Sequence, residues 1–358
     1  KVRLCDEHRA TALESARNGI VLLKNDGVLP LDASRYKKIM VTGINADDQN
    51  ILGDWSAPEK DENVTTILEG LKMIAPDTQF DFVDQGWDPR NMDPKKVAEA
   101  AARAKSADLN IVVAGEYMMR FRWNDRTDGE DTDRSDIDLV GLQNELIEKV
   151  AASGKPTILI LVNGRPLGVQ WAAENLPAIV EAWAPGMYGG QAVAEILYGQ
   201  VNPSAKLAIY NHKPSQYFHP YAAGKPSTPL YPFGHGLSYT TYKYDDLKLA
   251  QKEITKDGTV DVSVKVTNTG DRDGVEIVQL YIRDKFSSVT RPVKELKDFT
   301  RVLLKAGESQ VVNFKITPDK LAFYDKKMKK IVEPGEFIVM VGASSDDKDL
   351  LKDSFFVK

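Results

Sequence analysis

Short runs of apolar residues, separated by longer amphipathic stretches, constrain the fold of this chain more than any other feature. The apolar runs occupy residues 38–43, 79–83, 109–114, 157–162 and 178–182. Between them, the spacing of apolar residues predicts helices over residues 66–71, 94–105, 142–152 and 192–198. Strands that are apolar along their whole length are buried on both faces, as in a parallel sheet covered by helices. We therefore expect an α/β fold over residues 1–209, a three-layer α/β sandwich with a mainly parallel sheet.

The last third of the chain has a different pattern. Residues 260–266, 279–283 and 337–341 alternate apolar and polar side chains with a period of two, which is typical of strands with one buried face. Such short strands, separated by turn signals, predict an all-β fibronectin type III-like sandwich over residues 244–358. Residues 210–243 are rich in Pro, Gly, His and Tyr without periodicity, and we interpret them as an ordered aromatic linker.

Composition excludes several classes of function. The net charge is -5 without a basic block, so we expect no nucleic-acid partner. The apolar runs are too short to span a bilayer. Cys5 is the single cysteine, which excludes an intrachain disulfide and a cysteine metal cluster. The four histidines lack metal-ligand spacing and no nucleotide-binding or Gly-x-Ser-x-Gly motif is present, so we predict neither a metal nor a cofactor.

A polar loop over residues 129–136 carries the strongest chemical signal. It follows an apolar run that ends in Gly115-Glu116, and it begins with a second such pair, Gly129-Glu130. Open α/β folds bind their ligands beyond the carboxyl ends of the strands, where a carboxyl group could act as a general acid. By sequence alone, a solvated acidic loop is the more natural interpretation. A calcium loop is a third, although the spacing lacks the central Gly and terminal Glu of an EF-hand.

The first residues include neither an initiator Met nor a signal peptide. We interpret the chain as the carboxyl-terminal piece of a longer protein. The alternative is that only a short tag has been removed.

Several stretches together resemble glycoside hydrolase family 3, of the β-glucosidase and β-xylosidase kind. These stretches are residues 16–31, residues 202–207 (Asn-Pro-Ser-Ala-Lys-Leu), residues 231–239 (Tyr-Pro-Phe-Gly-His-Gly-Leu-Ser-Tyr), and residues 291–296 with 306–308. In that family a (β/α)8 barrel carries an Asp nucleophile, an α/β sandwich domain supplies a Glu acid/base, and many members add a fibronectin-type domain. The chain resembles the second and third parts only, so the resemblance implies an N-terminal barrel domain as a partner.

The chain departs from the family pattern in two places. Residues 207–209 run almost directly into residues 210–215, where the family usually has a further stretch. Either a loop is shorter here or residues are missing from this numbering. The insertion over residues 117–128 is longer than in many members, which loosens the alignment of the loop that follows it.

The resemblance assigns roles to individual residues. Glu130 matches the family acid/base because it precedes the pair Asp133-Arg134. Retaining hydrolysis needs two carboxyl groups about 5 Å apart, one to attack and one to transfer the proton. Neighbouring acids would raise the pKa of such a carboxyl, whereas Arg126 and Arg134 would oppose that.

Three further residues are predicted to bind substrate. Trp55 and Trp123 could stack against sugar rings, with a buried core position as the alternative for Trp55. Glu116 could bind substrate, compete for the acid/base role or position the loop. The remaining tryptophans with apolar neighbours, Trp171 and Trp183, are expected in the core.

The expected protein is thus the C-terminal part of a retaining, exo-acting β-glucosidase or β-xylosidase that acts on terminal β-linked sugars of oligosaccharides. The resemblance favours a periplasmic or extracellular location and leaves a homodimer open. One alternative is a catalytically inert scaffold or carbohydrate-binding fragment. Another is a β-N-acetylhexosaminidase, which the Glu130 loop argues against because some such members use a barrel histidine instead.

Overall fold

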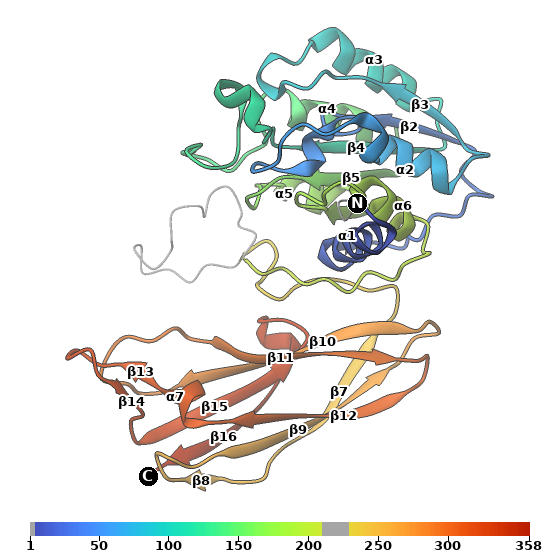
Figure 1. Cartoon of the computed structure of the whole chain (residues 1–358). Coiled ribbons are helices and arrows are strands. Elements are labelled where there is room, and N and C mark those ends of the chain that lie inside the picture. The colour runs from blue at the N-terminus through green and yellow to red at the C-terminus, as the bar shows by residue number, and fades with distance from the viewer. Residues whose placement is uncertain (1–3, 210–228) are drawn as a thin grey trace. The chain divides into compact units, whose positions relative to one another are not determined.

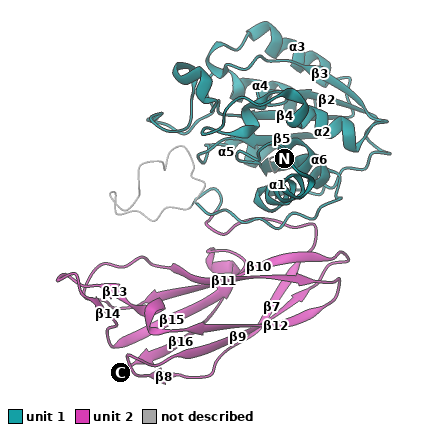
Figure 2. Ribbon diagram, in the orientation of Figure 1, with its two compact units in different colours: residues 1–231 teal, residues 232–358 magenta. Residues whose placement is uncertain are grey.

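A computed structural model describes residues 4–209 and 229–358. The chain divides into two compact units, residues 1–231 and residues 232–358 (Figure 2). Most of the predicted linker, residues 210–228, lies outside the described residues. Of the linker residues that are described, those up to Tyr231 belong to the first unit and those from Pro232 onward belong to the second.

The first unit is built on a six-stranded sheet with the order β1-β6-β5-β4-β2-β3 (Figure 1). The strands are β1 (Val21–Asn25), β2 (Lys38–Thr42), β3 (Gln79–Val83), β4 (Leu109–Gly115), β5 (Thr157–Val162) and β6 (Ala178–Glu181). All neighbouring pairs are parallel except β1 and β6, which are antiparallel. The mainly parallel sheet predicted from the apolar runs is confirmed, and β1 adds an antiparallel edge.

Helices cover both faces of this sheet. They are α1 (Asp6–Gly19), α2 (Ile67–Ile74), α3 (Pro94–Ala104), α4 (Gln143–Ala151), α5 (Gln170–Asn175) and α6 (Gly189–Leu197). On one face α6 packs against α1 and α2, and on the other α3 packs against α4 (Figure 1). The sequence sets where α2 and α3 begin, because Thr66 forms a capping box with Glu69 and Asp93 caps a helix whose first residue is Pro94. The three-layer sandwich is therefore confirmed.

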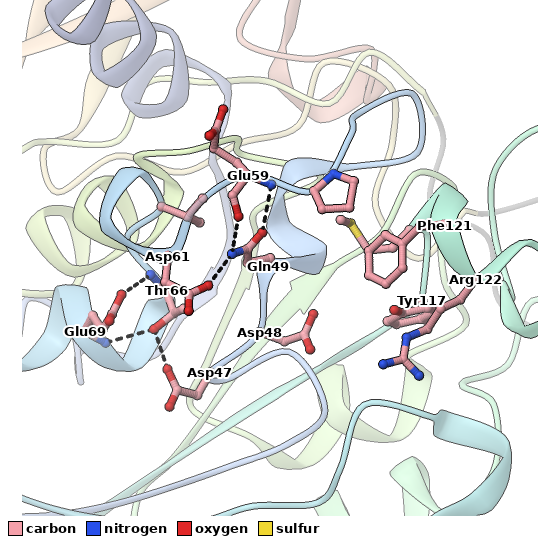
Figure 3. Close-up of a pocket in the computed structure, with 13 residues that line it drawn as sticks. Asp47, Asp48, Gln49, Glu59, Asp61, Thr66, Glu69, Tyr117, Phe121 and Arg122 are labelled. Carbon is pink, nitrogen blue, oxygen red and sulfur yellow. Dashed lines mark hydrogen bonds between the residues drawn. The ribbon is translucent and has the colours of Figure 1, made fainter. Parts of the chain in front are cut away.

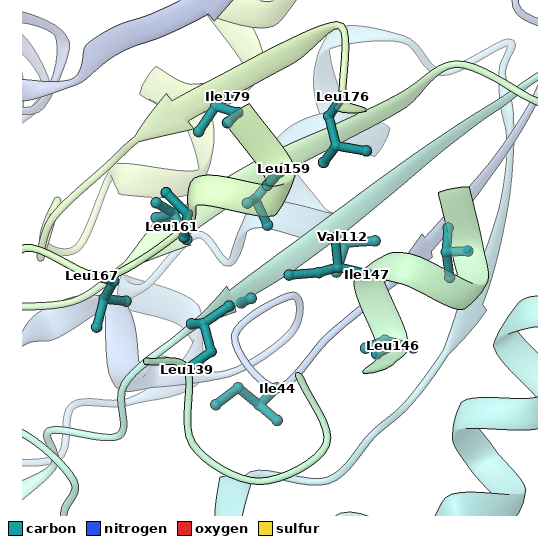
Figure 4. Close-up of a cluster of buried hydrophobic side chains, with 14 of the residues drawn as sticks. Ile44, Val112, Leu139, Leu146, Ile147, Leu159, Leu161, Leu167, Leu176 and Ile179 are labelled. Carbon is teal, nitrogen blue, oxygen red and sulfur yellow. The ribbon is translucent and has the colours of Figure 1, made fainter. Parts of the chain in front are cut away.

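The core on the α3, α4 and α5 side is apolar and closed to solvent (Figure 4). Alternate residues of the central strands, among them Val112 and Leu159, face Leu146 and Ile147 of α4. Every residue of β5 is buried, as expected for a central strand with helices on both sides. Replacing one of these leucines by alanine typically costs about 2–5 kcal/mol of stability.

The chain order of the strands creates a topological switch point between β2 and β4. The chain leaves β2 toward β3 at one edge, whereas it leaves β4 toward β5 and β6 at the other. Gly115 ends β4 with a φ of 140°, and a Cβ atom there would lie 2.0 Å from the Val162 carbonyl oxygen, so only glycine fits. The loops after β2 and β4 diverge at this point, where open α/β folds bind ligands.

The second unit is a β-sandwich. Its five-stranded sheet has the order β11-β10-β15-β16-β8 and its three-stranded sheet the order β12-β9-β7. The strands are β7 (Tyr242–Leu249), β8 (Glu253–Ile254), β9 (Val260–Asn268), β10 (Gly274–Asp284), β11 (Glu295–Leu304), β12 (Ser309–Ile316), β15 (Gly335–Gly342) and β16 (Leu350–Val357), with a small pair β13 (Phe323–Tyr324) and β14 (Lys330–Ile331) and a short helix α7 (Pro318–Leu321). Alternate valines of β9 point into a core that also contains the stacked rings of Phe337 and Phe355. The fibronectin type III-like sandwich is confirmed.

Short 3-10 helices occur in the loops of both units: η1 (Gln49–Leu52), η2 (Asp61–Asn63), η3 (Pro89–Asn91), η4 (Arg120–Asp125) and η7 (Asp347–Asp349). Of the described helices, none combines the length and the apolar character needed to cross a bilayer.

The prediction that Trp171 belongs to the core is wrong. Its side chain is exposed, and Trp183 is half-buried. Trp171 lies on α5, a helix of six residues that buries only Ala172. A helix this short has room for one buried position, so an apolar neighbour in the sequence does not bring its tryptophan inside.

Candidate active site at the switch point

Asp54 joins the two loops that diverge at the switch point. It follows β2, yet its Oδ1 accepts a hydrogen bond of 2.8 Å from Nη1 of Arg126 in the loop after β4. Its Oδ2 accepts a second, of 2.9 Å, from the backbone N–H of Glu130. Arg120 approaches the same carboxylate, with Nε 3.2 Å from Oδ1. One carboxylate of the first loop thus fixes the backbone of the second where the predicted acid/base stands.

Gly129 is required for this close approach. Its φ is 104°, and a Cβ atom there would lie 2.6 Å from Cγ of Asp54 and 2.9 Å from Nη1 of Arg126. Any other residue would be strained and would also push apart the groups that hold the loop. The structure therefore explains why glycine precedes Glu130, which the sequence alone could not explain.

Glu130 presents its carboxylate to solvent. The side chain is 50% exposed and pairs with the guanidinium of Arg120. Its backbone carbonyl accepts a hydrogen bond of 2.8 Å from Nη2 of Arg126, so the main chain is fixed on both sides while the carboxyl group stays accessible. The cations expected to face this carboxylate were Arg126 and Arg134. Instead Arg126 binds the carbonyl and Arg134 pairs with Glu116.

Tryptophan and arginine side chains stack beside Glu130. The guanidinium carbon of Arg120 lies 3.2 Å from the ring centroid of Trp55 and 5.0 Å from that of Trp123. Arg126 covers Trp123 at 3.8 Å. Trp55 is 75% exposed, which rules out the core position. The structure thus brings three of the predicted site residues, Trp55, Trp123 and Glu130, together around Arg120.

Glu116 occupies the opposite environment. Its side chain has no exposed surface and pairs with Arg134, while its Oε2 has no hydrogen-bond partner among the described residues. Burial raises the pKa of Glu116 to about 7, against the opposing effects of the nearby Thr127 hydroxyl and of the charge of Arg134. A carboxyl group enclosed in this way cannot contact a sugar at the surface, so its predicted contact with substrate does not fit this placement.

Arg134 connects Glu116 to the rest of the loop through hydrogen bonds. Its Nη2 donates hydrogen bonds of 2.8 Å to Oδ1 of Asp136 and 2.6 Å to the carbonyl of Asp138. The guanidinium therefore ties the buried end of β4 to the segment beyond Glu130.

Asp128 is an anchor that the sequence did not single out. Its Oδ2 accepts a hydrogen bond of 2.6 Å from the N–H of Gly164, and its Oδ1 accepts one of 3.0 Å from Nε of Arg165. It also accepts from the N–H of Gly129 at 2.7 Å. The loop after β5 thereby supports the Glu130 loop. The sequence did not indicate this role, because Asp128 stands among other acidic residues.

Glu181 is a second buried carboxyl group, and it was not predicted from the sequence as a site residue. It is fully buried at the end of β6, where its Oε1 accepts a hydrogen bond of 3.0 Å from the N–H of Trp183. Burial raises the pKa of Glu181 to about 8. Its position at the end of an apolar run is the one signal that the sequence offered.

A cavity of about 590 Å3 lies between the two loops (Figure 3). Residues of the first loop, including Asp48 and Gln49, form one wall, and Tyr117, Phe121 and Arg122 of the second form the other. Within the described parts of the chain, no group of three or more His, Cys, Asp or Glu side chains is arranged to hold a metal ion.

Known protein families match both units. Residues 20–239 match the model of the glycosyl hydrolase family 3 C-terminal domain, and residues 276–345 match that of a fibronectin type III-like domain. A beta-xylosidase of Formosa agariphila is 41% identical over 376 residues, which cover 99% of this chain and 51% of that protein. A periplasmic beta-glucosidase of Salmonella typhimurium is 36% identical over 381 residues, covering 94% of this chain and 49% of that protein.

Solved structures agree with these matches. The beta-glucosidase from Listeria innocua in complex with glucose superimposes with a TM-score of 0.88 at 30% identity. That match covers 99% of this chain and 50% of the Listeria chain. The chain spans about half the length of the curated relatives it matches.

Proposed function

The chain belongs to glycoside hydrolase family 3, and from this membership we propose that it supplies the acid/base half of the active site of a retaining, exo-acting β-glycosidase. The other half, an Asp nucleophile, would come from a barrel domain, since the described residues form an α/β sandwich and a β-sandwich. The proposed substrate is an oligosaccharide with a terminal β-linked sugar, and the proposed location is the periplasm or the cell exterior. We also propose the division of the chain into an α/β domain that carries the acid/base loop, a linker and a fibronectin-like domain.

One observation carries the proposal: the Glu130 loop is fixed by its backbone while the carboxyl group remains accessible. Asp54 and Arg126 hold the main chain on either side of this residue. A general acid must keep a constant position relative to the leaving oxygen and must also reach it. Glu116 fails the second requirement because it has no exposed surface.

In the proposed reaction Glu130 acts twice. It first donates a proton to the glycosidic oxygen while the nucleophile of the barrel attacks the anomeric carbon. It then removes a proton from the water that hydrolyses the glycosyl-enzyme, which requires the two carboxyl groups to lie about 5 Å apart. Trp55 and Trp123 would offer ring faces to the sugar on the leaving side. Glu116 would act as a positioning residue through Arg134.

Replacing Glu130 tests this assignment in the complete protein. Glu130→Ala should lose about 10²–10⁴-fold of the activity on cellobiose or xylobiose, because their leaving groups need protonation. Substrates with good leaving groups should keep more activity, and added azide should partly rescue it by replacing the water. Turnover like that of the wild type on these disaccharides would remove Glu130 from the role.

The second candidate function is a catalytically inert sugar-binding or scaffold fragment. It is favoured by the placement of Glu116, because a buried carboxyl cannot serve as the second catalytic group. An assay with a nitrophenyl β-glycoside separates the two once a barrel domain is supplied, because only an acid/base half would then restore hydrolysis. We expect no hydrolysis until a barrel domain is supplied, and activity of the chain alone would contradict the division of the active site.

The identity of the sugar is left to the barrel in this proposal. The relatives are named for different sugars: one is a beta-xylosidase and another an exo-alpha-(1->6)-L-arabinopyranosidase. Because they share the α/β and fibronectin-like parts with this chain, those parts do not by themselves select the terminal sugar.

A further inference from the structure

We propose that Arg165, in the loop after β5, is a positioning residue that sets where the Glu130 carboxyl group stands during proton transfer. The proton-transfer part rests on the proposed function, whereas the fixing of the loop does not. Arg165 approaches the Glu130 loop from a neighbouring strand, so its substitution should alter catalysis without removing a group that is assigned to the substrate.

The Glu130 loop needs support from outside. Between Gly115, which ends β4, and Gln143, which begins α4, these described residues form η4 and no other helix or strand. A long irregular segment keeps backbone freedom unless other contacts remove it. The sheet order places β4 between β2 and β5, so the loops after those two strands are its neighbours. Asp54, from the loop after β2, binds the backbone N–H of Glu130 and supplies one support.

Arg165 supplies the second support. Its Nη2 donates hydrogen bonds of 2.6 Å to the carbonyl of Thr132 and 3.3 Å to that of Thr127, and its Nε donates one of 3.0 Å to Oδ1 of Asp128. Thr127 lies three residues before Glu130, and Thr132 lies two residues after it. One planar guanidinium therefore binds the loop on both sides of the proposed proton donor, and its rigid fork fixes the separation of the two carbonyls.

Asp128 strengthens this support because it binds both loops. Its carboxylate accepts from Arg165, from the N–H of Gly164 at 2.6 Å and from the N–H of Gly129 at 2.7 Å. The residue is only 5% exposed. A buried carboxylate is costly unless it is paired and hydrogen-bonded. Loss of the guanidinium should therefore displace Asp128 and, with it, the adjacent Gly129-Glu130 pair.

Arg165 is itself held by its surroundings. It precedes Pro166, and a following proline restricts the backbone to extended conformations. Its carbonyl accepts a hydrogen bond of 2.8 Å from Nδ2 of Asn163, which also donates one of 3.3 Å to Oε2 of Glu181. Asn163 and Glu181 are both fully buried. These two residues, which have no step in the proposed reaction, thus connect the support of the Glu130 loop to the ends of β5 and β6.

The expected effect on catalysis is large for a residue that does not touch the substrate. Displacing a reacting group by about 1 Å can cost about 10²-fold in rate. In the complete protein, Arg165→Met should lower kcat on cellobiose or xylobiose about 10–100-fold and change KM by less than about 3-fold. Turnover of a nitrophenyl β-glycoside with added azide should stay within about 3-fold, because neither the good leaving group nor azide needs Glu130.

A double-mutant cycle with Glu130→Ala shows whether Arg165 acts through Glu130. If it does, Arg165→Met should change the residual turnover of Glu130→Ala by less than about 3-fold. An equal loss in both backgrounds would mean a general role in folding and would overturn the proposal. Arg165→Lys keeps the charge beside Asp128 without the fork, and it serves if Arg165→Met does not fold. We expect an intermediate loss, and turnover like that of the wild type would also overturn the proposal.

Arg17→Met is the matched control. Arg17 binds Glu195 through Nε at 2.6 Å and Nη2 at 2.7 Å. The two side chains are 29% and 6% exposed, close to the 20% and 7% of Arg165 and Asp128. Arg17 and Glu195 belong to α1 and α6, not to the Glu130 loop. The control should keep the ratio of turnover on the two kinds of substrate, and a change like that of Arg165→Met would contradict a specific role.

Hydrogen exchange in the complete protein separates this inference from the proposed function. The amides of residues 129–132 should exchange more than about 10-fold faster in Arg165→Met than in Arg17→Met, because the loop has lost one support. Unchanged exchange would overturn the inference and leave the assignment of Glu130 standing. Faster exchange, together with wild-type turnover of Glu130→Ala, would refute the proposed function and leave the fixing of the loop by Arg165 in place.

Discussion

Two Gly-Glu pairs, Gly115-Glu116 at the end of β4 and Gly129-Glu130 in the loop that follows, have the same dipeptide and opposite surroundings. Glu116 is fully buried against Arg134, whereas Glu130 is half exposed against Arg120. Each pairs with an arginine, so the difference lies in the solvent and not in the partner. A buried charge is costly unless it is paired, while an exposed pair contributes little. The same dipeptide therefore serves as a structural anchor in one place and as an available carboxyl group in the other.

The largest expected effect comes from removing the partner of the buried glutamate. Arg134→Met should lower the free energy of unfolding by up to about 3–5 kcal/mol at pH 8, because Glu116 loses its arginine partner and must be buried either as an unpaired charge or with a proton taken up from solvent. At pH 5, below its raised pKa of about 7, Glu116 is neutral and the loss should be smaller. Urea unfolding at the two pH values measures both.

The control for this experiment is the double variant Glu116→Gln with Arg134→Met, which removes the buried charge as well. It should recover part of the loss at pH 8. An equal loss at both pH values would mean that the arginine stabilises the loop by packing and not by charge.

The pH dependence of stability gives a second test of the difference between the two glutamates. The pKa of Glu116 rises from 4.5 unfolded to about 7 folded, so between these values the folded state holds a proton that the unfolded state has lost. Stability therefore falls as pH rises from about 4.5 to 7, by at most about 3 kcal/mol from this group. Glu116→Gln should remove that part of the slope. Parallel stability curves of wild type and variant would show that the carboxyl group is not desolvated.

The sequence predicted the sheet well and the site less completely, for a physical reason. Central strands such as β4 and β5 are buried on both faces, so their apolar runs mark them unambiguously. β7 and β11 are half exposed and carry many charges, so no simple period marked them. Within the site, the residue types and both Gly-Glu pairs were recognised.

Burial and partners of the site residues were beyond the sequence because they depend on contacts distant in the chain. Asp54 meets Arg126 across 72 positions, and no local pattern indicates that pairing. The same holds for Arg120, which was not expected to be the cation beside Glu130. Whether Glu130 performs the catalytic step that the resemblance implies remains a prediction.

Gly129 provides a test of how the exposed pair is held. Gly129→Ala should cost about 1–3 kcal/mol, because the residue keeps φ at 104° and its new Cβ meets Asp54 and Arg126. Gly27→Ala is the matched control, since its φ is 89° but nothing lies within 4 Å of its Cβ position. Thermal unfolding should show a greater loss for Gly129→Ala. Equal losses would attribute the whole effect to the backbone angle and none to the contact with Asp54.

The smallest effect on stability should come from the residue proposed to matter most for catalysis. Glu130→Gln breaks an ion pair whose glutamate is 50% exposed, so the free energy of unfolding should change by no more than about 1 kcal/mol. The variant keeps the backbone bonds to Asp54 and Arg126, because they involve the main chain. A loss of several kcal/mol in urea unfolding would place Glu130 among the structural carboxyl groups, like Glu116. A near-neutral result together with a large loss of turnover is what separates a group held ready for proton transfer from one that holds the fold.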